Sequence, residues 1–168
     1  MQTTIEQYLP DHEFFTGLDT AATDLLAGCA ADIEVRSGEL LFRKDDPANH
    51  FYLLRRGRVA IEVPTPGRPM VLDTFGDGDV VGWSWVVPPY LWTFDGRSSI
   101  DTSAVAFDAA CLRGKCLANP VLGYDLMRRF VQLMNHRLLS ARIRLLDLYG
   151  GDPWVSVADL QPGGLRRR

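Results

Sequence analysis

The stretch Leu72-Asp73-Thr74-Phe75-Gly76-Asp77-Gly78-Asp79-Val80-Val81-Gly82 decides the fold of this 168-residue chain. A short run that ends in Phe75 is followed by glycine and aspartate, which favour tight turns because they tolerate left-handed backbone angles. A valine pair then leads to another glycine. The stretch therefore predicts a strand, a tight turn and a second strand.

The same pattern of short apolar runs and turn residues extends on both sides of this stretch, from Ile33 to Phe107. Short apolar runs are separated by glycine, proline, asparagine or aspartate; the runs are 33–36, 40–42, 51–55, 59–63, 70–75, 80–85, 97–100 and 104–107. Many short strands without helices between them are typical of a sandwich, a barrel or a roll, and not of a parallel sheet. We therefore expect a mainly β fold.

Helical patterns flank the strand region at both ends. Thr20 is expected to cap a helix that ends at Gly28, and Asn119-Pro120 opens a long helix that runs to about Tyr149. The predicted boundaries are 1–28 for an N-terminal helical segment, 29–108 for the strand region, 109–149 for the C-terminal helices and 150–168 for a flexible tail. This length suits one domain with an appended tail.

The long helix carries a heptad seam. Its members are spaced alternately four and three residues apart: Met127, Val131, Met134, Leu138, Ala141, Leu145 and Leu148. Such a seam is typical of two helices packed against each other, so we expect a homodimer through this helix. The alternative is a single wide apolar stripe that faces the core of a monomer.

Composition argues against several classes of partner. A formal net charge of -3 disfavours a dedicated nucleic-acid coat and a polybasic membrane binder. The chain has neither the ~20 consecutive apolar residues of a membrane span nor a signal-peptide pattern at its start, so we expect a cytoplasmic protein with no membrane contact. The three cysteines, Cys29, Cys111 and Cys116, are then expected to be reduced thiols.

The sequence shows no catalytic pattern. His12, His50 and His136 fall in three different regions, whereas a metal centre in a roll needs two or three ligands that converge from neighbouring strands. The sequence has no nucleophile elbow, zinc-binding helix motif, phosphate-binding loop or dinucleotide fingerprint. We therefore expect neither an enzyme nor a resident cofactor or metal.

Two further stretches complete a family pattern. Phe51–Ile61 is predicted as a strand, a glycine turn and a strand, and Arg97-Ser98 follows the deciding stretch, ahead of a short and a long helix. With Gly82, this order of elements over about residues 12–149 resembles the cyclic nucleotide-binding domains of the Crp–Fnr regulators. The resemblance implies a double-stranded β-helix, that is, a jelly-roll-like β-roll, with flanking helices and a long C-terminal dimerisation helix.

The ligand-binding cassette of that family is altered here. In the family it runs from Gly-Glu to Arg-Ser or Arg-Ala; a short helix and the Arg hold the cyclic phosphate, and the Glu accepts the ribose hydroxyl. Gly82, Arg97 and Ser98 match, but Trp83 stands in the Glu position, and the segment between is longer and contains two prolines. The resemblance implies weak binding of a cyclic nucleotide such as cyclic AMP at these positions: Gly82, Trp83, Ser84, Arg97, Ser98, Ser99 and, on the long helix, Arg142.

Five aromatic residues stand within this cassette: Trp83, Trp85, Tyr90, Trp92 and Phe94. Three interpretations are open. These residues fill the former nucleotide pocket, or they line a pocket for a planar ligand, or they form an exposed patch for a protein partner. The sequence leaves these three alternatives open.

The sequence favours a regulatory sensor module that binds a small ligand. The alternative is a non-sensing interaction or assembly module that has kept the fold and lost the ligand; pairing of Arg97 with Asp95, two residues earlier, would make the guanidinium less available to a phosphate. A transcription factor is less favoured, because only 19 residues follow the long helix and a helix-turn-helix domain does not fit. We therefore expect no nucleic-acid partner.

Overall fold

The computed structural model describes residues 3–149 of the chain. The chain divides into two compact units, and the boundary between Leu126 and Met127 falls inside the longest helix. The first unit holds the sheet. The predicted tail, 150–168, lies outside the described residues.

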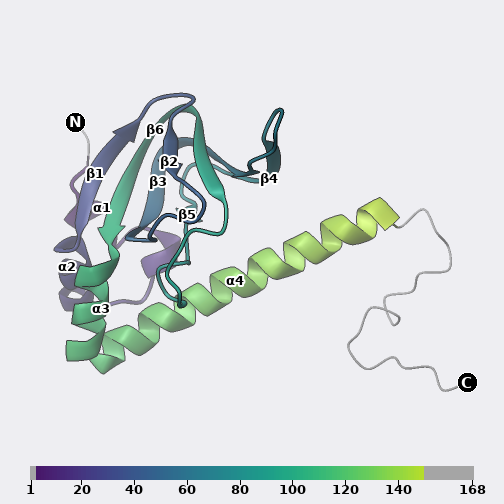
Figure 1. Cartoon of the computed structure of the whole chain (residues 1–168). Helices are drawn as coiled ribbons and strands as arrows, with labels where there is room; N and C mark the ends of the chain where they lie inside the picture. The colour runs from purple at the N-terminus through teal and green to yellow at the C-terminus, as the bar shows by residue number, and fades with distance from the viewer. Residues whose placement is uncertain (1–2, 150–168) are drawn as a thin grey trace, which may run out of the picture. The chain divides into compact units, whose positions relative to one another are not determined.

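The first unit contains one antiparallel sheet (Figure 1). Its strands are β1 (Ala30–Val35), β2 (Leu40–Phe42), β3 (His50–Val63), β4 (Met70–Phe75), β5 (Val80–Val81) and β6 (Asp95–Asp108). The order is β1-β6-β3-β4, with β2 also paired to β6 and β5 also paired to β3. The β3–β6 pair runs from His50 opposite Asp108 to Glu62 opposite Asp95 and forms the centre of the sheet.

Each of the two longest strands joins two of the predicted runs. The turn predicted at Gly57 is wrong: this residue lies within β3, where the register with β6 shifts. Gly57 has a φ of +122°, and a Cβ there would lie 2.6 Å from the Cα of Thr102. The glycine therefore lets the two strands approach closely instead of reversing the chain.

Short helices precede the sheet: α1 (Ile5–Tyr8), the 3-10 helix η1 (Glu13–Phe15) and α2 (Thr20–Ala27). Asp19 caps α2, because its carboxylate accepts the N–H of Ala22 at 2.7 Å. The cap predicted at Thr20 is wrong by one residue, since Thr20 is already helical. The side chain of His12 fixes this region to the turn before β5: its Nε2 lies 2.8 Å from the carbonyl oxygen of Gly78.

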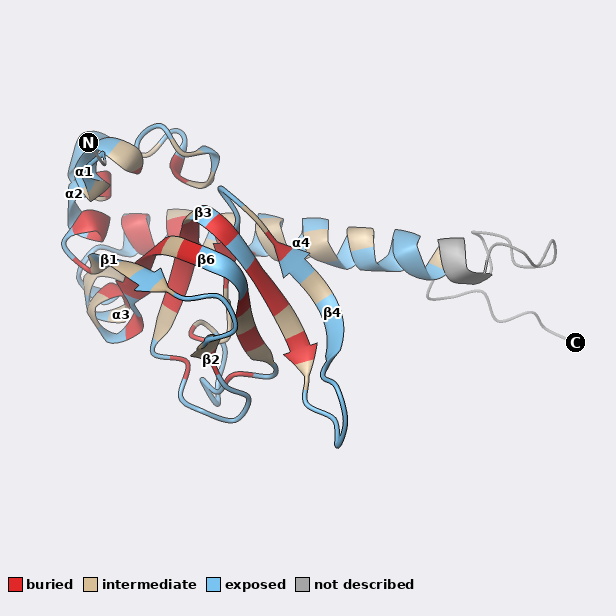
Figure 2. Ribbon diagram, turned by 90° about the horizontal axis from the view of Figure 1, so that it is seen from above, coloured by how far each residue is buried: buried red, intermediate tan, exposed pale blue. Residues whose placement is uncertain are grey.

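The core lies against the two central strands. Figure 2 shows buried residues concentrated along β3 and β6. The rings of Phe51 and Phe107 stack with centroids 4.4 Å apart, and Trp85 stacks on the first of them at 5.6 Å. Phe15 packs beside Phe107, with ring centroids 5.8 Å apart. The core therefore contains a cluster of stacked aromatic rings, and one of its members comes from the altered cassette.

A disulfide joins Cys29 to Cys111, whose Cα atoms are 5.7 Å apart. The prediction that both are reduced thiols is therefore wrong for this pair; Cys116 is free. The antiparallel pairing of β1 with β6 explains the proximity, because it places Ala30 opposite Phe107 and so brings Cys29 to the beginning of the following helix, α3 (Ala109–Ala118). The two cysteines are 82 residues apart in sequence, and the sequence gives no sign of this register.

Helix α4 (Pro120–Tyr149) begins at the predicted proline and continues into the second unit. Among the predicted seam residues, Val131, Leu138 and Leu145 are exposed on it. Within the described residues, no helix combines the length and the apolar character needed to span a membrane.

Candidate functional site

The altered cassette, Trp83–Phe94, is attached to the loop 45–48 by its main chain. The N–H of Trp92 donates to this loop at 2.9 Å, and its carbonyl accepts from the loop at 2.8 Å. The carbonyl of Tyr90 accepts the N–H of Ala48 at 2.7 Å. These bonds fix the backbone of Trp92 and of Tyr90, and so they restrict the position of the Trp92 indole.

Trp92 lies under the glycine that follows β5. Its ring stacks on Phe42, with centroids 3.8 Å apart and planes 13° from parallel, and Tyr52 lies beside both. Gly82 has a φ of +93°, and a Cβ built on it would lie 2.6 Å from the indole. Burial raises the pKa of Tyr52 to about 12, so its hydroxyl stays protonated in this stack. Aromatic side chains thus occupy the space directly beside Gly82.

The five aromatic residues of the cassette do not share one environment. Trp85 and Trp92 are buried, whereas Tyr90 and Phe94 are exposed. Tyr90 lies under the guanidinium of Arg113 on α3, 5.0 Å from it, and the same arginine donates to the carbonyl of Trp85 at 3.1 Å. The cassette therefore contributes to the core and also presents aromatic surface.

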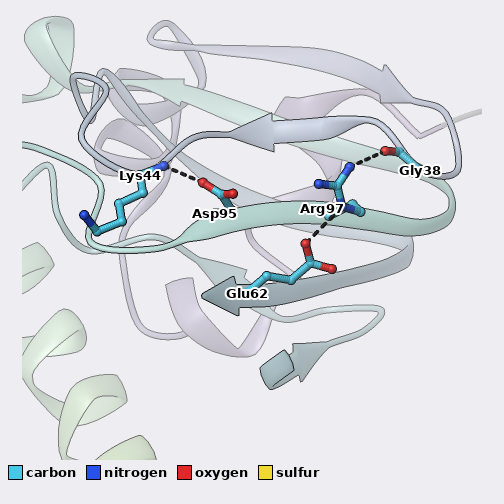
Figure 3. A network of polar contacts seen from close by, with 5 residues as sticks. All are labelled: Gly38, Lys44, Glu62, Asp95 and Arg97. Atoms are coloured by element: carbon cyan, nitrogen blue, oxygen red, sulfur yellow. Dashed lines mark hydrogen bonds and ion pairs between the residues drawn. The ribbon is translucent and has the colours of Figure 1, made fainter. Parts of the chain in front are cut away.

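Arg97 lies on β6, and its guanidinium is bound by two neighbouring residues (Figure 3). Its Nε donates to the Glu62 carboxylate at 2.9 Å, and one terminal nitrogen donates to the carbonyl of Gly38 at 2.7 Å. Glu62 is only 7% exposed, so the carboxylate is largely removed from water, whereas the arginine side chain is partly exposed. The expected pairing with Asp95 is wrong, because that carboxylate accepts the main-chain N–H of Lys44 at 2.7 Å instead.

A pocket of about 570 Å³ opens beside this ion pair. Arg97 lines it together with residues 38–43 and Asp46. Two cations, two carboxylates and several apolar side chains therefore border it: Arg43, Arg97, Glu39, Asp46, Leu40, Leu41 and Phe42. Neither Gly82 nor its two successors line this pocket.

The predicted ligand-binding positions lie on several elements. Gly82, Trp83 and Ser84 follow β5, whereas Arg97 borders the pocket on β2 and β6. Ser99 is exposed, and its carbonyl accepts the hydroxyl of Ser37 at 3.1 Å.

Ser98 and Arg142 occupy two further environments. The Oγ of Ser98 is fully buried and lies 2.7 Å from the Oγ1 of Thr102, so its hydroxyl serves the sheet. Arg142 is exposed on α4, within the second unit.

Sequence reasoning missed two residues that define these environments. Glu62 is a charged residue between apolar neighbours in the strand Val59–Val63, and such an inward-facing charge is a recognisable signal for a buried ion pair. Phe42 carries no such signal, since an apolar residue in a short strand is ordinary. Its contact with Trp92 depends on the pairing of distant segments.

The sequence pattern of the family described as the cyclic nucleotide-binding domain matches residues 32–119. One relative is the CRP-like cAMP-activated global transcriptional regulator of Mycobacterium tuberculosis (strain ATCC 25618 / H37Rv), 23% identical over 145 residues. The match covers 86% of this chain and 63% of the relative, so the chain spans less than two thirds of that protein. A 62-residue stretch, 36% of this chain, is 39% identical to 19% of the acetyltransferase Pat of Mycolicibacterium smegmatis.

Solved structures resemble the chain over most of its length. A cyclic nucleotide-binding domain from Methylobacillus flagellatus KT gives a TM-score of 0.72 at 17% identity, covering 86% of this chain and 82% of that one. The sensor domain of the transcriptional regulator DNR from Pseudomonas aeruginosa gives 0.64 at 19% identity, covering 79% and 90%. At these identities the likeness is one of fold, and it confirms the predicted roll with flanking helices.

Proposed function

Because the chain belongs to the cyclic nucleotide-binding domain family, we propose that it is a cytoplasmic regulatory module that acts through protein contacts and holds no cyclic nucleotide tightly. One relative that matches most of the chain is a transcriptional regulator. The function is therefore one of interaction, with the roll as a rigid platform. This is the non-sensing alternative that the sequence left open.

The observation that carries this proposal is the position of Trp92. Its indole stacks on Phe42 at 3.8 Å and packs against Gly82, so the space next to that glycine holds a side chain of the protein itself. The main-chain bonds to the loop 45–48 resist its displacement. Trp83 also lacks the carboxylate that the family uses for the ribose hydroxyl, and losing a charged acceptor costs about 1.5–3 kcal/mol of binding energy.

The ion pair of Arg97 supports the same proposal. Its Nε is committed to Glu62 and one terminal nitrogen to Gly38. A phosphate would have to compete with a buried carboxylate for this guanidinium. Binding of a cyclic nucleotide through Arg97 is therefore expected to be weak.

A second candidate, a weak small-molecule sensor, is favoured by the pocket beside Arg97. Its volume of about 570 Å³ is large enough for a metabolite, and the arginine is 34% exposed there. This candidate retains the sensor hypothesis but moves the ligand away from Gly82.

The proposed partner of α4 is a second copy of the chain. Val131, Leu138 and Leu145 are exposed apolar members of one heptad seam on this helix. Exposed apolar seams of this kind are covered by a matching helix in coiled-coil dimers. The exposed residues of the cassette, including Val87, Tyr90 and Leu91, offer a further surface to a protein partner.

Thermal unfolding in the presence of cyclic AMP or cyclic GMP tests the proposal. A ligand at 100 times its dissociation constant would stabilise the fold by about 2.7 kcal/mol, or roughly 5–11 °C at this size. We expect no such shift for the unaltered protein with either nucleotide at millimolar concentration. A shift of several degrees at micromolar nucleotide would overturn the proposal.

Indole rescue tests the position of the tryptophan directly. Trp92→Ala should lower the melting temperature, and added indole should recover part of the loss, since engineered apolar cavities bind matching apolar molecules. Trp92→Phe serves as the matched control, because it keeps a ring on Phe42 and should respond less to indole. Equal responses of the unaltered protein and Trp92→Ala would show that the indole does not fill this space.

A further inference from the structure

We propose that the Cys29–Cys111 disulfide is a redox-controlled clamp that fixes α3 to the beginning of β1, and that its reduction by a dithiol releases this helix. The bond joins two elements that are 82 residues apart in sequence. α3 leads through Asn119 directly into α4. The clamp therefore holds the helix through which the chain leaves the roll.

The sheet places the two cysteines together independently of the sulfur–sulfur bond. The N–H of Asp108 donates to the carbonyl of Cys29 at 2.8 Å, which extends the β1–β6 ladder by one residue. The carboxylate of Asp108 then accepts the N–H of Cys111 at 2.6 Å and caps α3. These bonds bring Cys111 back to Cys29 whenever the first turn of α3 packs against the sheet again, so the disulfide can form again after reduction.

Few noncovalent contacts hold α3. Ala109 and Leu112 are its fully buried side chains. Lys115 donates to the carbonyl of Leu25 at the end of α2, and Arg113 donates to the carbonyl of Trp85. Because few contacts attach α3 to the rest of the fold, loss of the disulfide should lower the free energy of opening this helix strongly.

Arg113 connects the clamp to the cassette. Its guanidinium lies 5.0 Å from the ring of Tyr90, which is exposed at the surface. Release of α3 therefore alters the exposed aromatic surface as well as the start of α4. One redox event therefore affects the cassette surface that is proposed to meet a partner and the first turn of the helix that carries the heptad seam.

The exposure of the two cysteines indicates which one an external thiolate attacks. Cys29 is 6% exposed and Cys111 is more exposed, so attack is expected at Cys111. Attack forms a mixed disulfide with Cys111, and the electron pair of the broken S–S bond leaves on Cys29, which takes up a proton. The second thiol of the dithiol then displaces Cys111. In total the protein gains two electrons and two protons, and the dithiol becomes a disulfide.

Cys116 lies on the same helix and serves as an internal control, because it is not part of the disulfide. Burial raises the pKa of its thiol, which lowers the fraction present as the reactive thiolate. It lies five residues beyond Cys111, about 7.5 Å along the helix axis and on another side, and it packs near Gly123 of α4. It is therefore poorly placed to attack the disulfide.

A cytoplasmic protein rarely carries a purely structural disulfide, and disulfides there are usually transient, catalytic or redox-sensing. In this respect the inference rests on the proposed location. The redox state and exchange of the purified protein depend neither on its location nor on nucleotide binding.

Alkylation with mass spectrometry measures the redox state of each cysteine in the full chain. Purified under air, the protein should show one alkylated cysteine, Cys116, after unfolding without reductant. A folded sample incubated with dithiothreitol should show three, and removal of the reductant with added oxidised glutathione should restore one. Three free thiols under air, or a bond that resists dithiothreitol in the folded protein, would overturn the proposal.

Hydrogen exchange of the oxidised and reduced forms measures the release of α3. Amides of α3 should exchange on the order of tenfold faster or more after reduction, because opening a weakly attached local unit becomes easier once the covalent link is removed. Amides of β3 should keep their protection. Unchanged exchange in α3 would show that the bond clamps nothing, and loss of protection throughout the sheet would show a purely structural staple; either result overturns the proposal.

Two variants separate the clamp from other effects of reductant. The double variant Cys29→Ser/Cys111→Ser should match the reduced protein and show no further response to dithiothreitol. Cys116→Ser should respond as the unaltered protein does. A response that follows Cys116 instead of the pair would assign the redox sensitivity to the wrong residue and contradict the proposal.

Discussion

Replacing Arg97 with alanine should destabilise the protein in the absence of any ligand. Its Nε lies 2.9 Å from the carboxylate of Glu62, which is 7% exposed, so the substitution leaves a buried charge without its ion partner. Breaking a buried pair costs about 3–5 kcal/mol. Because the arginine side chain is 34% exposed and water screens it in part, we expect about 2 kcal/mol. At this chain length that lowers the melting temperature by roughly 4–8 °C.

Urea unfolding of four proteins measures the coupling between the two charged residues: the unaltered chain, Arg97→Ala, Glu62→Ala and the double variant. The double variant should recover part of the stability that each single variant loses, with a coupling free energy of at least about 1 kcal/mol. Arg43→Ala is the control, since Arg43 lines the same pocket from an exposed position and surface substitutions usually stay within about 0.5 kcal/mol. Additive losses in the double variant would refute the ion pair and leave the guanidinium free for a ligand.

Three further predictions follow from the described contacts. Gly82→Ala should cost about 2–4 kcal/mol in urea unfolding, because its φ is +93° and the new methyl group meets the indole of Trp92; an unchanged midpoint would contradict this packing. Burial lowers the pKa of His12 from its ordinary 6.5, so the unfolded state binds a proton more tightly than the folded state does. The free energy of unfolding should therefore be constant above pH 6.5 and fall as the pH drops below it. Urea midpoints from about pH 8 to about pH 5 check this, and the contribution of His12 to the pH dependence should be absent in His12→Asn. Leu138→Glu combined with Leu145→Glu should give a folded monomer by sedimentation velocity, and an unaltered protein that is already monomeric would rule out the seam as an interface.

The fold was predictable because its signals are local. A cluster of glycine and aspartate, 76–79, marks the turn before β5, Gly82 follows that strand, and Pro120 marks the first turn of α4. The error at Gly57 has a physical cause: a glycine that permits close approach of two strands has the same local sequence as one that reverses the chain. Only pairing with the distant β6 distinguishes the two.

The site was less predictable because its contacts depend on register between segments far apart in sequence. Arg97 finds Glu62 across the β3–β6 ladder, 35 residues away, while the nearer Asp95 turns to Lys44. The aromatic cluster was visible in the sequence, yet nothing local distinguishes the buried Trp92 from the exposed Tyr90 in the same segment.

Among the described strands of the sheet, β6 comes last in the chain, and β1, β2 and β3 all pair with it. Ala30 finds its partner only when Phe107 has left the exit tunnel, a separation of 107 − 30 = 77 residues. Pairings this distant form slowly because a long loop must close first. Until then the nascent chain carries Phe51 and its apolar neighbours uncovered, so synthesis of this protein is expected to depend on chaperones that shield such segments.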